Sequence, residues 1–257
     1  MATRPYAEES RGRSWFHLLT TLAVLLVAVA GAILAPWWPL KLLASVIEAL
    51  TMVRLFILLH DLHHAAIFRD SPVAKGILKL YGLVLLTPTR IWTVTHNYHH
   101  AHTAKTEGSQ RGTFKLLTTK QWLAATPKER FRYRVERNPL IIVFGYVTCF
   151  LLGFGVVPSL TNPRRYWDSV VGLILHVAAA AALLVFGGFS AFFFAFLLPF
   201  LLSGVMGTYL FYVQHNFEGA QLAPSDEWNH TKASLEGSSY LKTGPVMRWF
   251  TGNIGFH

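Results

Sequence analysis

The stretch LKLLASVIEALTMVRLFILLHDLHH, residues 40–64, decides the fold. Residues 40–59 form an apolar run as long as a helix needs to cross the hydrocarbon core of a bilayer, about 20 residues. The run ends in His-Asp-Leu-His-His, so it predicts a spanning helix that carries imidazoles at the membrane surface. Glu48 and Arg54 lie inside the run, and because charges are costly in lipid we expect both to face the interior of a helix bundle.

Three further apolar runs predict additional spanning helices, at residues 16–35, 170–186 and 189–213. Only Gly187-Gly188 separates the last two, which indicates a tight helical hairpin. The predicted fold is an all-α integral membrane protein with four transmembrane helices plus interfacial or re-entrant helices, in a single domain over residues 1–257.

Two shorter apolar stretches are not expected to cross. Residues 77–86 are too few to span a bilayer. Residues 140–157 contain three glycines and end at Pro158. Because His96 and His215 can meet only if an even number of crossings separates them, and the hairpin already supplies two, we expect residues 140–157 to dip into the membrane or lie on it.

Composition supports a membrane protein and argues against an ordinary globular domain or a cysteine-based metal site. Hydrophobic residues make up 53% of the 257 residues and charged residues only 14%, against about a quarter in ordinary globular domains. The single cysteine, Cys149, excludes an intrachain disulfide and a thiolate cluster.

The net charge of +10 follows the loops rather than a nucleic-acid-binding face, since residues 61–139 alone hold thirteen Lys and Arg. The positive-inside rule therefore places this region and both termini in the cytoplasm. Residues 113–138 are basic and amphipathic, and we expect them to lie at the headgroup level.

The histidines form clusters. On a helix, positions i, i+3 and i+4 share one face, so the first cluster and most of the second each direct several imidazoles to one point. The members are His60, His63 and His64; His96, His99, His100 and His102; and His215 at the end of the last apolar run.

Clustered imidazoles without thiolates suit iron, copper, zinc or nickel and exclude iron–sulfur clusters. Seven or more are too many for one four-coordinate zinc, so two metal ions are the simpler count. Asp61 is a candidate to orient an imidazole through its far nitrogen. His17, His176 and His230 stand apart from the clusters, and we expect structural roles for them.

These motifs resemble the membrane fatty acid desaturase family, in particular its bacterial acyl-lipid, delta-12 (omega-6) type. The similar stretches are HDLHHAAIF from His60, LTPTRIWTVTHNYHHAHT from Leu86, LFYVQHNFEGA from Leu210 and GSSYLKTGPVMRWFTGNIGFH from Gly237. The resemblance implies a non-haem diiron centre at the cytoplasmic face of a bacterial inner membrane. Dioxygen would be the co-substrate, and a cis double bond would be introduced into a fatty acyl chain.

The resemblance also implies a ligand set. The implied iron ligands are His60, His64, His96, His99, His100, His215 and His257. His63 stands where the family usually has a small residue, so its role stays open, as do the roles of Asp61 and His102.

The third histidine box of the family departs from its pattern in this sequence. The box should continue with two more histidines after His257, where the sequence stops. We therefore expect the domain to be incomplete at its C-terminal end, through truncation or because the sequence is a fragment. As written, the chain is expected to bind iron poorly and to be inactive.

Substrate and partners follow from the same interpretation. The inward faces of the second and fourth spans would line an acyl channel, with Leu55, Phe56, Leu210 and Phe211 as candidates, although ordinary helix packing explains each of them equally well. No flavin or nicotinamide motif is present, so a separate electron donor such as a ferredoxin or a cytochrome-b5-like protein is implied. The basic residues 115–137 would mainly attach to anionic lipid and secondarily dock this donor.

Two alternatives remain open at the level of sequence. A hydroxylase or a carotenoid-modifying oxygenase could use the same histidines, although the QHNFE and TGNIGFH stretches favour the acyl desaturases. A metal transporter is more distant, because transporters place their ligands near the bilayer midplane, and here only Glu48 is a carboxylate within a span.

Overall fold

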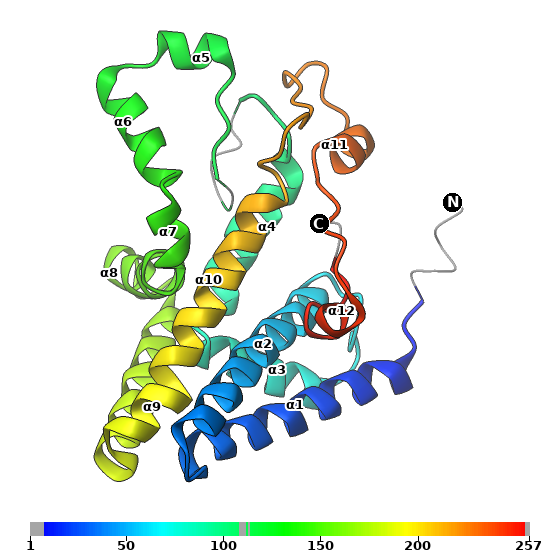
Figure 1. Cartoon of the computed structure of the whole chain (residues 1–257). Coiled ribbons are helices and arrows are strands. Elements are labelled where there is room, and N and C mark those ends of the chain that lie inside the picture. Colours follow the sequence, from blue (N-terminus) through cyan, green and yellow to red (C-terminus); the bar gives the residue numbers. More distant parts are fainter. Residues whose placement is uncertain (1–7, 108–111, 113, 255–257) are drawn as a thin grey trace.

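The first two helices form an antiparallel pair. The computed structural model describes residues 8–107, 112 and 114–254 (Figure 1). Helix α1 (Arg11–Leu34) turns at Ala35 into α2 (Trp38–His63), which starts with a proline in its first turn. Leu18 of α1 and Leu55 of α2 are fully buried in the core between them.

The next two helices form a sharp corner that brings the second histidine cluster beside the first. Helix α3 (Pro72–Val84) is capped by the Ser71 hydroxyl, and α4 (Thr89–His102) leaves it at 92°. Leu86 at the corner has φ 59°, in the left-handed region. The carboxylate of Asp168 accepts the Arg90 N–H at 2.8 Å and so caps the first turn of α4 from a distant helix.

Three short helices form the arm that follows α4, and the first two of them extend away from the rest of the molecule (Figure 1). They are α5 (Thr119–Ala124), α6 (Pro127–Glu136) and α7 (Pro139–Val143), and none of their residues is buried. Helices α5 and α6 each begin with a reciprocal capping box, built by Thr118 and by Thr126. The predicted basic stretch is therefore helical over most of its length from Thr119 onward; Thr113, at its start, lies outside the described residues.

The apolar stretch at residues 140–157 does not form a helix of spanning length. It gives a π-helical segment, η2 (Tyr146–Val156), followed by α8 (Val157–Thr161), and together these are shorter than a bilayer crossing requires. Gly145 and Gly204 allow η2 and the later helix α10 (Leu198–Val213) to touch at backbone distance, since a Cβ on Gly204 would lie 2.5 Å from the Tyr146 nitrogen.

The hairpin predicted at Gly187-Gly188 is confirmed. Helix α9 (Trp167–Phe192), the short π-helical η3 (Phe193–Leu197) and α10 (Leu198–Val213) are continuous apart from Gly188, whose φ of 73° and ψ of 177° break the helix. The His176 and Phe200 rings meet across the turn, with centroids 4.6 Å apart. The 47 residues would be about 70 Å long if straight, so the break turns one overlong helix into two antiparallel arms (Figure 1).

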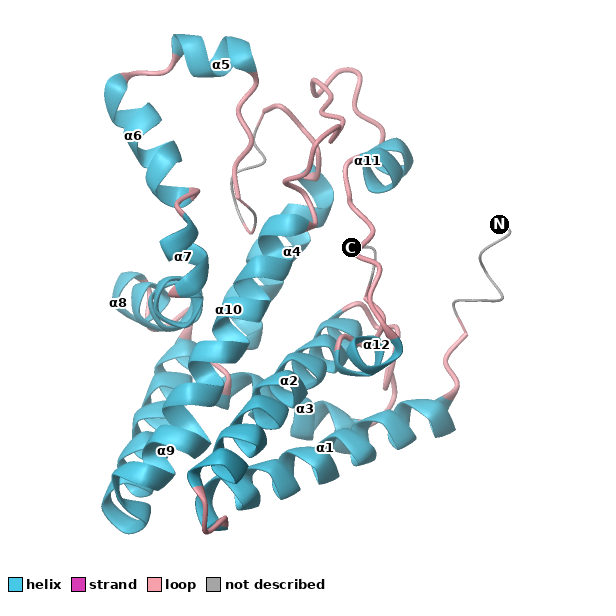
Figure 2. Cartoon of the chain, viewed as in Figure 1, coloured by secondary structure: helices cyan, strands magenta, loops and turns pink. Residues whose placement is uncertain are grey.

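The predicted all-α fold class is confirmed for the described residues, which contain helices and loops but no strand (Figure 2). By length and composition, three stretches of the described residues could cross a membrane: α1, α2 and the bent α9–α10 stretch. The α3–α4 pair, bent by 92°, would be a fourth if it is counted as one span. Glu48 and Arg54 are each only 4% exposed, inside the bundle as predicted. The chain then closes with α11 (His230–Glu236) and α12 (Pro245–Phe250), which packs against α2.

Candidate metal centre

Four histidines from two helices converge at one point. His60 and His64 come from the end of α2, and His96 and His100 come from α4. Each offers a ring nitrogen, and these four nitrogens all lie within 4.8 Å of one another. The pairing follows from the i, i+4 spacing, which turns two imidazoles of each helix toward the corner where the helices meet.

The spacing of these nitrogens fits ligands of one metal ion. His96 Nε2 lies 2.9 Å from His64 Nε2 and 3.1 Å from His100 Nε2. Two imidazoles that bind one ion at about 2.1 Å and at right angles have nitrogens about 3.0 Å apart. A donor set of imidazoles without thiolate is suited to iron, zinc, copper or nickel, so the cluster can hold a metal ion.

Hydrogen bonds behind the rings fix which nitrogen faces the cluster. The Nδ1 of His60 lies 3.1 Å from a carboxylate oxygen of Asp61, the neighbour that the sequence suggested for this role. The Nδ1 of His215 lies 3.1 Å from the Gly237 carbonyl oxygen. Each contact favours the tautomer with the proton on Nδ1 and leaves Nε2 as the lone-pair donor, which is the usual arrangement behind metal-bound imidazoles.

A second group of imidazoles lies beside the first. The His99 and His215 rings are 4.6 Å apart, and His99 is 6.2 Å from His96. Burial, and then the neighbouring His215, lower the pKa of His99 to about 3, and burial also lowers the pKa of His100 to about 4. Both imidazoles are therefore neutral at physiological pH and able to bind a cation. The structure thus brings His215 to the same face as the two clusters, as the even number of crossings requires.

The histidines left open by the sequence point elsewhere. The Nδ1 atoms of His63 and His102 contact carbonyl oxygens of their own helices, Leu59 at 2.7 Å and Tyr98 at 2.8 Å. Neither belongs to the group of four. His257 lies outside the described residues, so its predicted role as a ligand remains a prediction.

The histidines assigned to structure make contacts that fit that assignment. His176 is buried between the Tyr146 hydroxyl, at 2.7 Å from Nε2, and the Val84 carbonyl, at 3.2 Å from Nδ1. His17 contacts the Arg54 guanidinium at 3.1 Å. His230 starts α11 at an exposed position.

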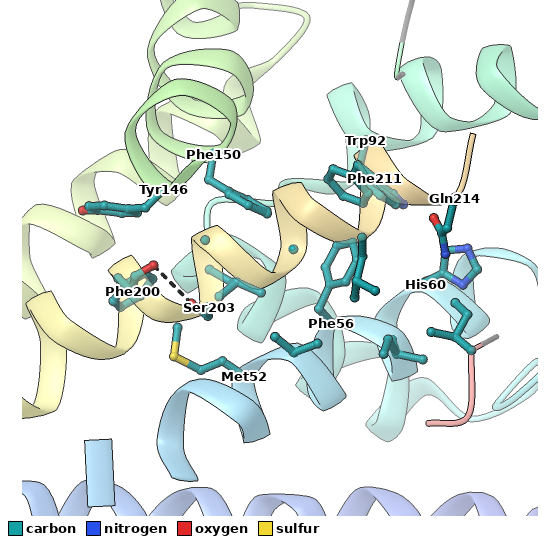
Figure 3. A pocket seen from close by; sticks show the side chains of 17 residues that line it. Met52, Phe56, His60, Trp92, Tyr146, Phe150, Phe200, Ser203, Phe211 and Gln214 are labelled. Carbon is teal, nitrogen blue, oxygen red and sulfur yellow. Dashed lines mark hydrogen bonds between the residues drawn. The ribbon is translucent and has the colours of Figure 1, made fainter. Parts of the chain in front are cut away.

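A narrow apolar cavity ends at the histidines (Figure 3). It runs between α2, η2 and α10, with His60 and Gln214 at one end and Tyr146 and Phe200 toward the other. Phe56, Leu210 and Phe211, three of the four predicted channel residues, belong to its lining. Leu55 does not, because adjacent residues of a helix point about 100° apart, and Leu55 faces the core against α1 instead.

A second, wider cavity of about 330 Å³ lies next to the first and shares part of its lining. It touches His96, His99 and His215 and is otherwise mostly apolar. Trp92, Phe211 and Gln214 line both cavities.

Trp92 and Gln214 were missed by the sequence reasoning. Trp92 is 4% exposed and stacks on His96, with ring centroids 4.6 Å apart. Its position four residues before His96 on one helix could have indicated this contact. Gln214 precedes His215, but nothing in the sequence indicated that its side chain would reach the end of a cavity.

Comparison with known proteins agrees with this geometry. The family model described as fatty acid desaturase matches residues 35–257. A protein of Bacillus subtilis (strain 168) named fatty acid desaturase is 32% identical over 219 residues, which are 85% of this chain and 62% of that protein. The chain therefore spans less than two thirds of the length of this relative.

Proposed function

The chain belongs to the fatty acid desaturase family, and from this premise we propose that it introduces a cis double bond into a fatty acyl chain with a histidine-held pair of iron ions. One observation carries the proposal: an apolar cavity ends at a cluster of four imidazoles, of which those of His60 and His96 are buried. His60 is a member of both.

Two groups of ligands support two irons. His60, His64, His96 and His100 would hold one ion, and His99 with His215 would contribute to the other. When bound, the irons would supply the oxidising power, drawn from dioxygen and two electrons, that removal of hydrogen from an unactivated methylene requires. The protein's own contribution is orientation, because Asp61 and the Gly237 carbonyl direct Nε2 of their imidazoles toward the site.

The cavity walls would select and place the substrate. Its lining offers almost no polar groups apart from Gln214, Ser203, Tyr146 and His60, so it favours a hydrocarbon over a carbohydrate or nucleotide. The Trp92 ring forms part of the cavity wall and packs on His96. A methylene held at the His60 end would therefore lie beside the metals in a dry environment.

The arm formed by α5, α6 and α7 is basic, and we propose a secondary role for it in electron delivery. Arg137 joins the arm to the segment after α10, since its guanidinium donates to the Lys115 carbonyl at 2.7 Å and to the Asn216 side chain. Exposed apolar side chains such as Phe131 lie among the arm's cations, and this mixture favours anionic lipid as the main contact. An acidic donor such as a ferredoxin or a cytochrome-b5-like protein would dock there less strongly. The proposed location is a bacterial inner membrane, with the histidines and both termini on its cytoplasmic side.

The direct test of the activity is product analysis. The full-length protein is expressed in a host that lacks polyunsaturated lipids, and its fatty acids are profiled by mass spectrometry. New unsaturated acids that disappear in His96→Ala support the proposal. Hydroxylated acids or altered carotenoids would replace it by the related oxygenase activities.

A metal analysis of the same samples addresses the remaining alternative. The proposal expects iron in the wild-type protein and a loss of iron in His96→Ala. Metal uptake into liposomes that does not depend on oxygen would instead indicate transport.

A further inference from the structure

Arg54 lies in the middle of α2 and connects three separate parts of the chain. Its Nε donates to the Thr21 hydroxyl of α1 at 2.9 Å, and another guanidinium nitrogen lies 3.1 Å from Nδ1 of His17. The third nitrogen donates to the backbone carbonyl of Trp249 in α12. The guanidinium carbon also sits 4.2 Å from the centre of the Trp249 ring.

This cation is buried without a carboxylate partner among the described residues. Arg54 is 4% exposed, and the ion pairs formed by the described residues do not include it. A buried charge without a counterion depends on hydrogen-bond acceptors and aromatic faces for its stabilisation. Trp249 supplies one of each, so undocking α12 would leave the guanidinium incompletely solvated.

Docking of α12 also builds part of the cavity. Gly252 follows α12 with φ 56°, and a Cβ there would lie 3.0 Å from the Ile57 side chain, so the segment approaches α2 closely. Two residues later, Ile254 lines the narrow cavity together with His60 and Ile57. Figure 1 shows α12 lying across the C-terminal half of α2.

A second attachment holds the segment that leads to α12. The Ser239 N–H donates to the Gln214 carbonyl at 2.8 Å, and the Ser239 hydroxyl donates to the Val213 carbonyl at 2.9 Å. The Gly237 carbonyl accepts from His215, as described above. The C-terminal segment is thus fastened at the end of α10 and again, near Ile254, by Arg54.

We propose that Arg54 is a positioning residue: its buried guanidinium fastens α12 to α1 and α2, and this contact sets Ile254 as a wall of the apolar cavity beside the histidines. The proposal concerns how the cavity is closed and does not depend on which reaction takes place there. It assigns a purpose to an intramembrane cation that metal binding does not use.

Hydrogen–deuterium exchange of the whole protein in lipid nanodiscs tests this proposal. In Arg54→Gln, which keeps hydrogen-bonding capacity but removes the charge and the fork, we expect at least tenfold faster exchange at residues 245–254. Exchange in α9 and α10 should stay within twofold of wild type. Arg11→Gln, a change at an exposed arginine of α1 (51% exposed side chain), is the matched control and should alter neither region.

Arg54→Lys provides the second variant and decides the matter if Arg54→Gln does not fold. A lysine keeps the charge but not the planar fork that reaches several acceptors at once, so we expect an intermediate acceleration of about threefold at residues 245–254. Unchanged exchange there in both variants would overturn the proposal. Equal acceleration across all helices would also overturn it, because that result would assign Arg54 to general stability.

Discussion

Replacing Asp61 tests whether the groups behind the imidazoles matter for the metal. The carboxylate lies 3.1 Å from His60 Nδ1, and loss of such a partner typically weakens metal binding 10- to 100-fold. The Asp61 side chain is 39% exposed, so solvent screens part of its charge. We therefore expect Asp61→Ala to fall near the lower end, about a tenfold loss, which corresponds to about 1.4 kcal/mol.

The assay is an anaerobic competition titration of the metal-free protein in detergent, with Fe²⁺ and a chromophoric chelator. Asp61→Asn keeps an acceptor oxygen without the charge and should fall between wild type and Asp61→Ala. Asp70→Asn is the control, since Asp70 is an exposed residue whose ion pair among the described residues is with Arg11 at 3.8 Å. Affinities of Asp61→Ala and wild type that agree within twofold would show that this carboxylate does not orient His60.

Three other changes test packing, protonation and capping. Gly204→Ala should lower the free energy of unfolding by about 1–3 kcal/mol, because its Cβ would collide with backbone atoms of η2; thermal unfolding should show no such loss for Gly76→Ala, which meets nothing within 4 Å. Burial lowers the pKa of His99 to about 3, below the ordinary value near 6.5 in the unfolded chain. Because the unfolded state then binds more protons, the metal-free protein should lose stability as pH falls from about 6.5 toward 4. An unfolding midpoint independent of pH in that range would contradict this. Asp168→Ala should cost about 1–2 kcal/mol through loss of the α4 cap, and hydrogen exchange should then accelerate first in the opening turn of α4.

The spanning segments could be predicted from sequence because the bilayer imposes a simple rule of length and hydropathy. The Gly187-Gly188 break is confirmed by the positive φ of Gly188, and the burial of Glu48 and Arg54 follows from the cost of charge in lipid. The π-helical character of η2 could not be predicted. Nor could the close approach of η2 to Gly204 of α10, since this is a contact between segments about sixty residues apart.

The site was predictable where it depends on helical periodicity and obscure where it depends on the meeting of helices. The i, i+4 pairs on α2 and α4 indicated which imidazoles share a face, and Asp61 lies where sequence adjacency suggested. The direction of Leu55, into the core against α1, was missed, because an apolar run that is hydrophobic on every side gives no signal of which face lines a cavity. Trp92 and Gln214 lie between two cavities only because α4 and α10 meet there.

The metal cluster and the cavity share side chains, and this sharing limits how either can change. Trp92 stacks on His96 and at the same time walls both cavities, while His60 is both a candidate ligand and a part of the cavity lining. A smaller residue at Trp92 would widen the cavity, but it would also release the His96 ring, whose nitrogen lies close to those of His64 and His100. Changes in the shape of the cavity that preserve the histidine site must therefore come from its far end. Ser203 and Phe200 line the cavity there, away from the histidines proposed to hold the metals.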